Sequence, residues 1–491
     1  MKYLIVLFIL VSTDLIHAQE YKRSWNWTSG YAGNSIQFIS GNITTAIGQF
    51  PQKYFTAGNS CISDTNGNLL IHSNGFHVLN NQGGFIDNGD TLINDYYFSN
   101  QSGSSFESQT SIFLPVENSK IYFVTPTFSD PRAIDCHINN GNCYFDLLLY
   151  NVIDMNANAG AGKVVKRMQP LMQNANLRKT QMMACRHGNG KDWWLLKNEG
   201  DSANVHTFLF TQDSVYDKGV QVFAEPVWGP WDIRGQSTFN NDGTLFATTS
   251  HGSSTGLIFI ADFDRCYGLL SNPRTIQMPF GSMHDPIDTA KKERLSTGLA
   301  FSPNSQFLYV VSRRNLYQYD LLDSSWLHIV GLDTSYAAFQ NYETAYLGPD
   351  NRIYIGNFAG QSKQMSRIDN PDVKGAGCNF CPRCLRLDSL GTNAYVGTPP
   401  CMPNYGLGAK TCWPLNQSES GEPRALAWSF YPNPVNTILY IRNAKGKKKK
   451  LYNTYGQLLI STTKEEIDIS GLAKGLYFLS CEQQTQKVLV E

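Results

Sequence analysis

The chain has 491 residues and a mass of 54.9 kDa, and its 40 basic and 40 acidic residues leave no net charge. A balanced charge argues against a nucleic-acid binder that works through a basic field over its surface. Charged residues make up only 16% and aromatic residues 12% of the chain, which also has 41 glycines. Because disordered chains are rich in charge and poor in aromatic residues, this composition indicates a folded protein with many turns.

The first 18 residues have the pattern of a secretory signal peptide. A short basic start, Met1–Tyr3, precedes the apolar run Leu4–Val11, and a polar segment then ends at the small residue Ala18. This order predicts export with cleavage between Ala18 and Gln19. The apolar run is too short for a membrane anchor, which needs about 20 residues, and we expect no transmembrane span in the rest of the chain.

Residues 19–415 carry a recurring unit: an apolar or aromatic residue, a polar turn of Asn, Asp or Gly, and an apolar strand. Its six copies span residues 61–71, 113–123, 187–196, 239–247, 301–310 and 346–355. Successive turns lie 46 to 72 residues apart, which suits four-stranded propeller blades of about 40 to 50 residues that carry loop insertions. Continuous apolar runs such as 307–311 indicate strands that are covered on both faces, as in stacked blades.

These observations predict an all-β fold in which a β-propeller-like domain of six to seven blades is followed by a smaller β-domain. The seventh blade would be built partly from the N-terminal strands.

Ten of the eleven cysteines fall in this region, and an exported chain reaches an oxidising compartment where disulfides persist. Cys136 and Cys143 flank a short Asn/Gly loop and are predicted to pair. The other disulfide candidates cluster late in the chain: Cys378, Cys381, Cys384, Cys401 and Cys412. The spacing of the first three also suits zinc or an iron–sulfur cluster, but the oxidising destination favours disulfides, so we predict no metal site.

No catalytic constellation stands out, and we predict no catalytic residue and no cofactor. Residues 252–256 fit the G-x-S-x-G pattern of a nucleophile elbow, but an apolar strand follows them instead of a helix, so a hairpin loop explains them better.

Trp228 and Trp231 surround a Gly-Pro turn and form a candidate ligand platform for a sugar ring. Packing between blades is the interpretation that we favour. Acidic residues near strand ends, Asp232, Asp262, Asp264 and Glu343, leave a glycosidase open as an alternative.

Residues 428–491 predict a small antiparallel sandwich, preceded by a linker over 416–427. Short strands alternate with turns, beginning at the stiff Pro-Asn-Pro turn. The run Lys447–Lys450 is predicted to protect an edge strand from aggregation, with docking on anionic glycolipid as the alternative. From Arg424 onward the chain has 10 basic and 5 acidic residues, so this module is basic and the remainder is acidic.

This segment resembles the type A C-terminal sorting domain of the type IX (Por) secretion system. The matching motifs are FYPNPV (430–435), LYNTYGQ (451–457) and ISGLAKGLYFL (469–479), in the family's order and near its spacing. The resemblance implies an immunoglobulin-like sandwich that acts as an export signal. It assigns these residues to the sorting motifs: Tyr431, Pro432, Asn433, Pro434, Gly456, Gly475 and Tyr477. It also implies recognition by an outer-membrane translocon, removal by a sortase-like peptidase, and anchoring to surface glycolipid or release.

Residues 31–38 and 62–80 resemble the opening of secreted propeller-like cargo of the same export system, with WD40-like or kelch-like repeats and no catalytic residues to transfer. We therefore predict a secreted or cell-surface protein whose propeller is a non-enzymatic binding or interaction module. Glycans and glycolipid are candidate partners, and nucleic acid is not. The alternative is a secreted carbohydrate-active enzyme, a glycoside hydrolase or lyase, on the same scaffold.

Overall fold

The computed structural model describes residues 24–31, 33–39, 42–46, 48–50, 54–99, 104–117, 119–139, 143–200, 203–224, 235–249, 256–279, 297–312, 315–330, 342–357, 362–386, 397–412, 429–431, 434–442, 444–453, 457–481 and 484–490. The chain divides into two compact units, Met1–Lys410 and Thr411–Glu491, and each is described by itself. The predicted signal peptide, with its cleavage residues Ala18 and Gln19, and the predicted linker 416–427 lie outside the described residues.

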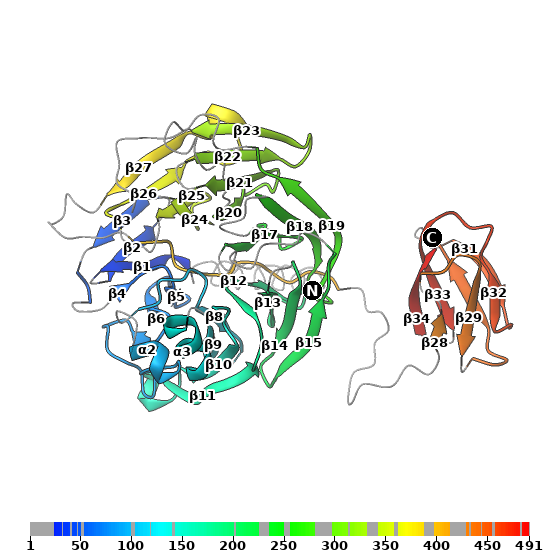
Figure 1. Ribbon diagram of the computed structural model, residues 1–491, viewed down its shortest axis with the longest axis horizontal. Helices are drawn as coiled ribbons and strands as arrows, with labels where there is room; N and C mark the ends of the chain where they lie inside the picture. The colour runs from blue at the N-terminus through cyan, green and yellow to red at the C-terminus, as the bar shows by residue number, and fades with distance from the viewer. Residues whose placement is uncertain are drawn as a thin grey trace, which may run out of the picture. The chain divides into compact units, whose positions relative to one another are not determined.

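Within the described residues, the strands of the first unit form seven antiparallel sheets that stand side by side in a ring (Figure 1). The first sheet has the order β3-β2-β1-β4, with β1 Asn26–Tyr31, β2 Asn34–Ile39, β3 Asn42–Ala46 and β4 Tyr54–Phe55. The second has the order β5-β6-β7, with β5 Ser60–Ser63, β6 Leu69–Ser73 and β7 Val78–Asn80. The third has the order β11-β10-β9-β8, with β8 Ile112–Pro115, β9 Lys120–Thr127, β10 Leu147–Asp154 and β11 Lys163–Met172.

The remaining four sheets keep their strands in chain order. The fourth contains β12 Leu177–Arg186, β13 Trp193–Glu199, β14 Val205–Phe210 and β15 Val215–Gln221. The fifth contains β16 Ser237–Phe239, β17 Leu245–Thr249, β18 Leu257–Asp264 and β19 Leu269–Gln277. The sixth contains β20 Gly298–Phe301, β21 Phe307–Ser312, β22 Asn315–Asp320 and β23 Ser325–Val330. The seventh contains β24 Tyr342–Leu347, β25 Ile353–Asn357, β26 Gln364–Ile368 and β27 Phe380–Arg386.

The ring confirms the predicted propeller-like repeat. Each of the six sequence copies lies where the first two strands of one sheet join, from the second sheet to the seventh. The N-terminal strands form the remaining sheet. Burial follows position along each sheet: β21 and β22 are buried at every residue, whereas β15 in the outer position of the fourth sheet is largely exposed. Strands that pack between two neighbouring sheets have no solvent-exposed face, which explains their continuous apolar runs.

The ring closes where the seventh sheet meets the first. Trp27 on β1 is 1% exposed, and its ring centroid lies 5.1 Å from that of Tyr354 on β25 and 4.7 Å from that of Phe38 on β2. Aromatic pairs at such distances contribute about 0.5–1.5 kcal/mol each beyond the area that they bury. The contact therefore joins two ends of the repeat domain that are over 300 residues apart in sequence.

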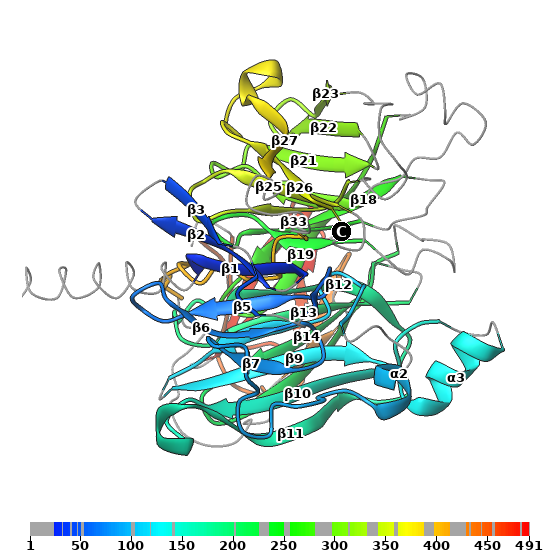
Figure 2. The same ribbon diagram turned by 90° about the vertical axis from the view of Figure 1, so that its left-hand side faces the viewer.

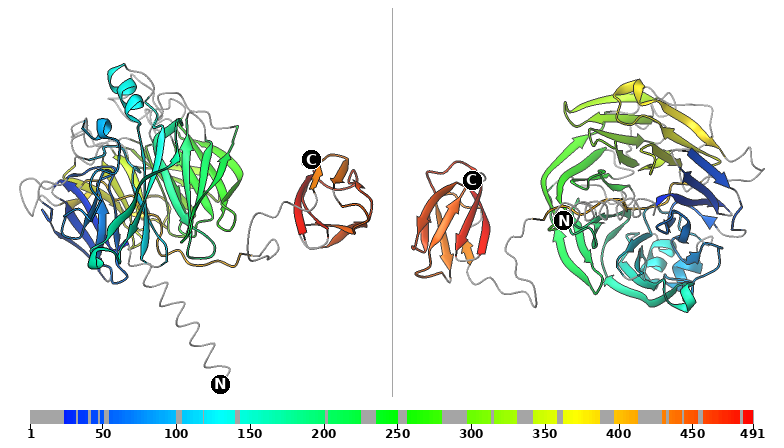
Figure 3. Two further views of the ribbon diagram at one scale, coloured as in Figure 1. Left: turned by 90° about the horizontal axis from the view of Figure 1, so that it is seen from below. Right: turned by 180° about the vertical axis from the view of Figure 1, so that it is seen from behind.

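Two short helices project from one face of the ring, as the turned views show (Figures 2 and 3). They are α2, Asp95–Ser99, and α3, Asp130–Ile138. Ser129 caps α3, because its side chain accepts a hydrogen bond from the backbone N–H of Arg132. Two 3-10 turns, Asn158–Gly160 and Gly375–Cys378, complete the described helical segments. No helix among the described residues is long and apolar enough to cross a membrane.

Cysteine pairing follows the prediction only in part. Cys136 and Cys143 form a disulfide beside α3, and Cys412 is also disulfide-bonded, as is Cys266, which the sequence analysis did not single out. The other four candidates are free thiols and are corrected here: Cys378, Cys381, Cys384 and Cys401. Cys378 ends the 3-10 turn Gly375–Cys378, whereas Cys381 and Cys384 both lie on β27, where the Cys384 thiol donates to the backbone oxygen of Cys381 at 3.4 Å. The Cys378 thiol hydrogen-bonds Tyr309, and that of Cys401 hydrogen-bonds Tyr346.

The second unit contains two sheets that enclose one apolar core. One has the order β28-β29-β32, with β28 Ser429–Tyr431, β29 Ile438–Arg442 and β32 Glu466–Asp468. The other has the order β31-β30-β33-β34, with β30 Lys449–Tyr452, β31 Leu458–Thr462, β33 Gly475–Cys481 and β34 Gln484–Val490. The predicted all-β class, with a repeat domain followed by a small β-domain, is thus confirmed.

The predicted role of the lysine run is corrected by this sheet order. Strand β30 pairs with β31 on one side and β33 on the other, so it is not an edge strand. Lys449 is buried and its Nζ donates to the backbone oxygen of Thr463 at 2.9 Å. The aliphatic stem of a lysine can cover apolar surface in this way while its amine keeps a partner.

The sorting-motif residues that the structure describes lie at the rim and in the core of this unit. Tyr431 is 43% exposed and stacks on Tyr440 at 5.5 Å, while Tyr477 is 8% exposed and donates from its hydroxyl to the backbone oxygen of Ala473 at 2.7 Å. Pro434 is exposed in the turn before β29, and Gly475 begins β33. Pro432, Asn433 and Gly456 lie outside the described residues.

Candidate functional site

A segment near the end of the first unit, residues 397–410, crosses the middle of the ring and is called the strap (the gold trace in Figure 1). Its sequence is rich in Pro and Gly, which suits an extended chain that carries few backbone donors. Its hydrogen bonds reach several sheets. The Cys401 N–H donates to Asn59 O at 2.9 Å, the Tyr405 hydroxyl to Phe113 O at 2.9 Å, and the Lys410 N–H to Gly188 O at 2.8 Å.

The strap packs tightly against the recurring turns of the fourth and fifth sheets. Gly243, in the turn between β16 and β17, has φ +70°, and a Cβ there would lie 2.6 Å from the Cys185 sulfur and 2.9 Å from the Leu407 side chain. Only glycine meets both demands, a left-handed backbone and a close approach. The turn that repeats along the sequence is therefore also the surface on which the strap rests.

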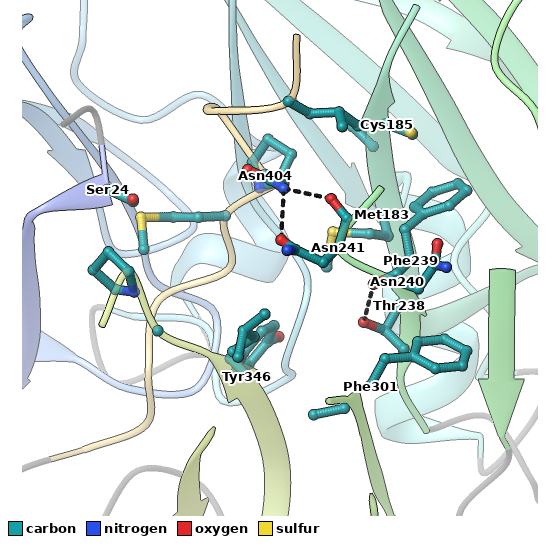
Figure 4. A pocket seen from close by; sticks show the side chains of 18 of the residues that line it. Ser24, Met183, Cys185, Thr238, Phe239, Asn240, Asn241, Phe301, Tyr346 and Asn404 are labelled. Carbon is teal, nitrogen blue, oxygen red and sulfur yellow. Dashed lines mark hydrogen bonds between the residues drawn. The ribbon is translucent and has the colours of Figure 1, made fainter. Parts of the chain in front are cut away.

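A pocket of about 110 Å³ lies between the strap and the inner strands of the ring (Figure 4). Four inner strands or their turns, the N-terminal segment and the strap all contribute to its wall. The lining residues are Ser24, Trp27, Met183, Ala184, Cys185, Thr238, Phe239, Asn240, Asn241, Ala300, Phe301, Tyr346, Leu347, Gly348, Pro349, Asn351, Pro400, Met402, Pro403, Asn404 and Leu407.

A hydrogen-bonded pair of asparagines fixes the strap at the pocket. The Asn404 Nδ2 donates to the backbone oxygen of Asn241 at 2.8 Å and to its Oδ1 at 3.1 Å, while the Asn404 Oδ1 accepts from the Gly406 N–H at 3.0 Å (Figure 4). These bonds leave the Nδ2 of Asn241 without a partner among the described residues. The carboxamide of Asn351, at φ +62° in the β24–β25 turn, is likewise without one. Two amide groups are therefore available to a ligand.

The pocket carries no formal charge. Its 21 described lining residues include no Asp, Glu, Lys, Arg or His. Burial raises the pKa of Tyr346 well above its ordinary range and the pKa of the Cys185 thiol to about 12, so both stay protonated at neutral pH. The neighbouring Cys401 thiol also has a pKa of about 12, because it is buried. At neutral pH the described lining thus offers hydrogen bonds and apolar contact but neither an ionised acid nor a base.

Glutamine side chains bridge the inner strands across the axis of the ring. The Gln236 Nε2 donates to Leu299 O on β20 at 3.0 Å and to Ala345 O on β24 at 2.7 Å. Its Oε1 accepts from the N–H groups of the same two residues, at 3.2 and 3.0 Å. Gln109 bonds both backbone groups of Ser237 in the same manner, at 2.7 and 2.9 Å. These two glutamines therefore form a polar network that links the inner strands of the fifth, sixth and seventh sheets.

Charged groups are buried among the inner strands outside the pocket lining. Lys179 and Glu107 form an ion pair at 3.5 Å with side chains 11% and 7% exposed. Glu343, one of the acids noted in the sequence, is 9% exposed at the start of β24. Burial, followed by the nearby Arg178, lowers the pKa of Lys197 well below its ordinary value. No group of three or more His, Cys, Asp or Glu side chains within the described ranges could hold a metal ion.

The predicted ligand platform, Trp228 and Trp231, lies outside the described residues. Asn241, Asn351 and Asn404 were not among the predicted site residues. The first two lie in copies of the recurring turn, and this shared position in the repeat is the signal from which a common location could have been inferred. No local pattern marks residues 397–410 as a strap, because its partners are dispersed along the chain.

Comparison with known proteins identifies the C-terminal unit. Residues 429–491 match the secretion system C-terminal sorting domain, and no curated protein matches the chain in sequence. The sorting domain directs the protein out of the cell, to the surface or the medium, through the type IX machinery. The predicted sorting domain and localisation are thereby confirmed.

The chain is similar in fold to several solved structures. The proposed 6-phosphogluconolactonase of Bacteroides uniformis is 10% identical, with a TM-score of 0.42, over 77% of this chain and 97% of that one. The periplasmic gluconolactonase PpgL of Pseudomonas aeruginosa is 10% identical, with a TM-score of 0.37, over 95% and 99%. A proposed 6-phosphogluconolactonase of Bacteroides fragilis is 10% identical, with a TM-score of 0.34, over 71% and 96%.

These similarities correct the prediction that the chain is not an enzyme. That prediction took a repeat scaffold without a catalytic motif as the mark of a binding module. The solved structures that the chain resembles include proteins named as lactonases. The physical reason is that activity depends on the side chains and loops placed around the ring, which the strand pattern leaves undetermined.

Proposed function

We propose that this chain is a type IX export cargo whose propeller binds a small, uncharged, hydroxyl-bearing ligand of the carbohydrate class in the pocket beneath the strap. The observation that carries the proposal is the neutrality of the lining, in which 21 residues include no charged side chain. A phosphorylated or carboxylated ligand would leave its charge unpaired there, at a cost that an uncharged ligand avoids.

The size and chemistry of the pocket restrict the ligand further. Its 110 Å³ is well below the roughly 300–1,000 Å³ of sites for drug-sized molecules, so it suits one sugar ring or a terminal sugar residue. The amides of Asn241 and Asn351 can bond hydroxyl groups, while Phe239, Phe301 and Met402 provide apolar contact. A few placed polar groups against an apolar wall are typical of small-molecule sites.

Calorimetry on the purified full-length chain tests the proposal with matched pairs of sugars. Glucose, galactose and N-acetylglucosamine are compared with glucuronate and galacturonate, which add one carboxylate. We expect at least one neutral sugar to bind at least tenfold more tightly than its uronate. Equal affinities within each pair, or tighter binding of the uronates, would contradict the proposal.

The variant Asn351→Asp places a carboxylate at the pocket without changing side-chain size, and Asp tolerates the left-handed backbone of this turn. We expect the neutral sugar to bind about fivefold more weakly, the effect of one lost hydrogen bond of about 1 kcal/mol. The matched control is Asn174→Asp, an exposed residue with φ 55° in the β11–β12 turn. Acid release from gluconolactone by the wild type but not by N351D would instead make the pocket a reaction site.

A further inference from the structure

The outward side of the β31-β30-β33-β34 sheet in the sorting domain is unusually apolar. Cross-strand pairs place Leu476 opposite Leu489, and Tyr452 opposite both Phe478 and Leu458. Among these residues, Leu458 is 50% exposed, Leu476 is 38% exposed and Leu489 is 40% exposed. We call these five residues the apolar face: Tyr452, Leu458, Leu476, Phe478 and Leu489. The alternate residues Leu451, Leu479 and Val488 fill the core, so the face is not the inner side of the sandwich.

Two lysines accompany this face on its described strands. Lys450 pairs with Ser480 and Lys487 pairs with Phe478, which places both lysines on the same outward side. The four strands contain no Asp or Glu. Exposed apolar area with a polar rim is typical of an interaction surface, whereas an antiparallel sheet with a solvated side usually presents polar residues there.

The outward side of the other sheet differs. Glu466 lies opposite Tyr440, Asp468 lies opposite Ile438, and the Arg442 guanidinium lies 4.4 Å from the centroid of the Tyr431 ring. Charges of both signs are thus mixed with apolar residues on that side. The sandwich therefore has one side suited to docking and one suited to solvent.

We propose that the apolar face is the surface by which the outer-membrane type IX translocon holds the sorting domain, through an apolar partner surface with carboxylates at its rim. The proposal rests on the export function, because the match to the sorting domain covers all four strands. A second copy of the chain fits the face less well, since a two-fold contact through it would bring lysines against lysines.

The test measures export of the full-length chain in a bacterium with a type IX system, by immunoblot of the periplasm, cell surface and medium. The variant Leu476→Gln with Leu489→Gln removes apolar area without adding charge, and the variant Lys487→Glu reverses one exposed charge. Because loss of a central apolar anchor weakens a contact by roughly tenfold or more, we expect exported protein to fall at least fivefold in the first variant, with accumulation in the periplasm. The matched control Ile438→Gln, 37% exposed on β29, should stay within twofold of the wild type.

Truncation after Leu415 provides the reference for lost sorting. Normal export of the truncated chain would overturn the export function itself. If the truncated chain is retained but L476Q/L489Q is exported normally, only the proposed role of the apolar face is overturned. If L476Q/L489Q is degraded in the periplasm, the variant Lys487→Glu is used in its place, because it changes an exposed residue. Unchanged export of Lys487→Glu would then contradict the proposal. A purified wild-type dimer that L476Q/L489Q converts to monomer would assign the face to self-association and would likewise overturn it.

Discussion

The substitution Gln236→Leu is expected to destabilise the propeller far more than an ordinary glutamine substitution. The Gln236 side chain is fully buried and its carboxamide makes four hydrogen bonds, two to Leu299 and two to Ala345. Leucine has a similar volume but offers no donor or acceptor, so two N–H and two C=O groups lose their partner. At about 0.5–1.5 kcal/mol for each bond, the free energy of unfolding should fall by about 2–6 kcal/mol.

The assay is urea unfolding of the full-length chain, followed by tryptophan fluorescence, which reports on buried residues of the ring such as Trp27 and Trp193. The control Gln82→Leu changes an exposed glutamine in the turn after β7 and should alter stability by no more than about 0.5 kcal/mol. The variant Gln236→Ala should cost less than Gln236→Leu, because water can enter the vacated space and pair with the backbone groups. A loss below about 1 kcal/mol in Q236L would refute the view that this carboxamide ties the inner strands together.

Two further predictions concern buried titratable groups. Lys197 has a folded-state pKa well below the 10.5 of its unfolded state, so between those values the unfolded chain binds more protons and the contribution of Lys197 to stability rises with pH. Between about pH 7 and about pH 9, the free energy of unfolding of the wild type should therefore rise relative to that of Lys197→Met, as measured by urea titrations. A difference that stays constant over this range would contradict the prediction. Burial raises the pKa of the Cys61, Cys185 and Cys401 thiols to about 12, so iodoacetamide at about pH 8.5 should leave them unmodified until urea unfolds the chain. Mass spectrometry of peptides reads this directly, and rapid labelling of these three sites in the folded protein would count against their burial.

Much of the architecture could be predicted because it depends on local chemistry. The polar turn flanked by apolar residues, as in 301–310, selects a hairpin, and its repetition predicts a ring of sheets. The buried strands β21 and β22 have no polar alternation because both of their faces are covered, and that signal is present in the residues themselves. The sorting motifs at 430–435 and 469–479 likewise lie within one short segment.

The site could not be predicted in the same way, because its members are brought together by closure of the ring. Gln236 bonds residues 63 and 109 positions away, and Asn404 bonds a turn 163 positions away. Nothing in the neighbourhood of any one of these residues indicates its partner. The late cysteines show the opposite error, since their proximity in sequence suggested pairing, yet Cys378, Cys381, Cys384 and Cys401 are free thiols. The sequence by itself determined the repeat, the turns and the export module, because hairpins form from neighbouring residues. The tertiary structure decided which side chains meet, because the pocket forms from segments that lie far apart in the sequence.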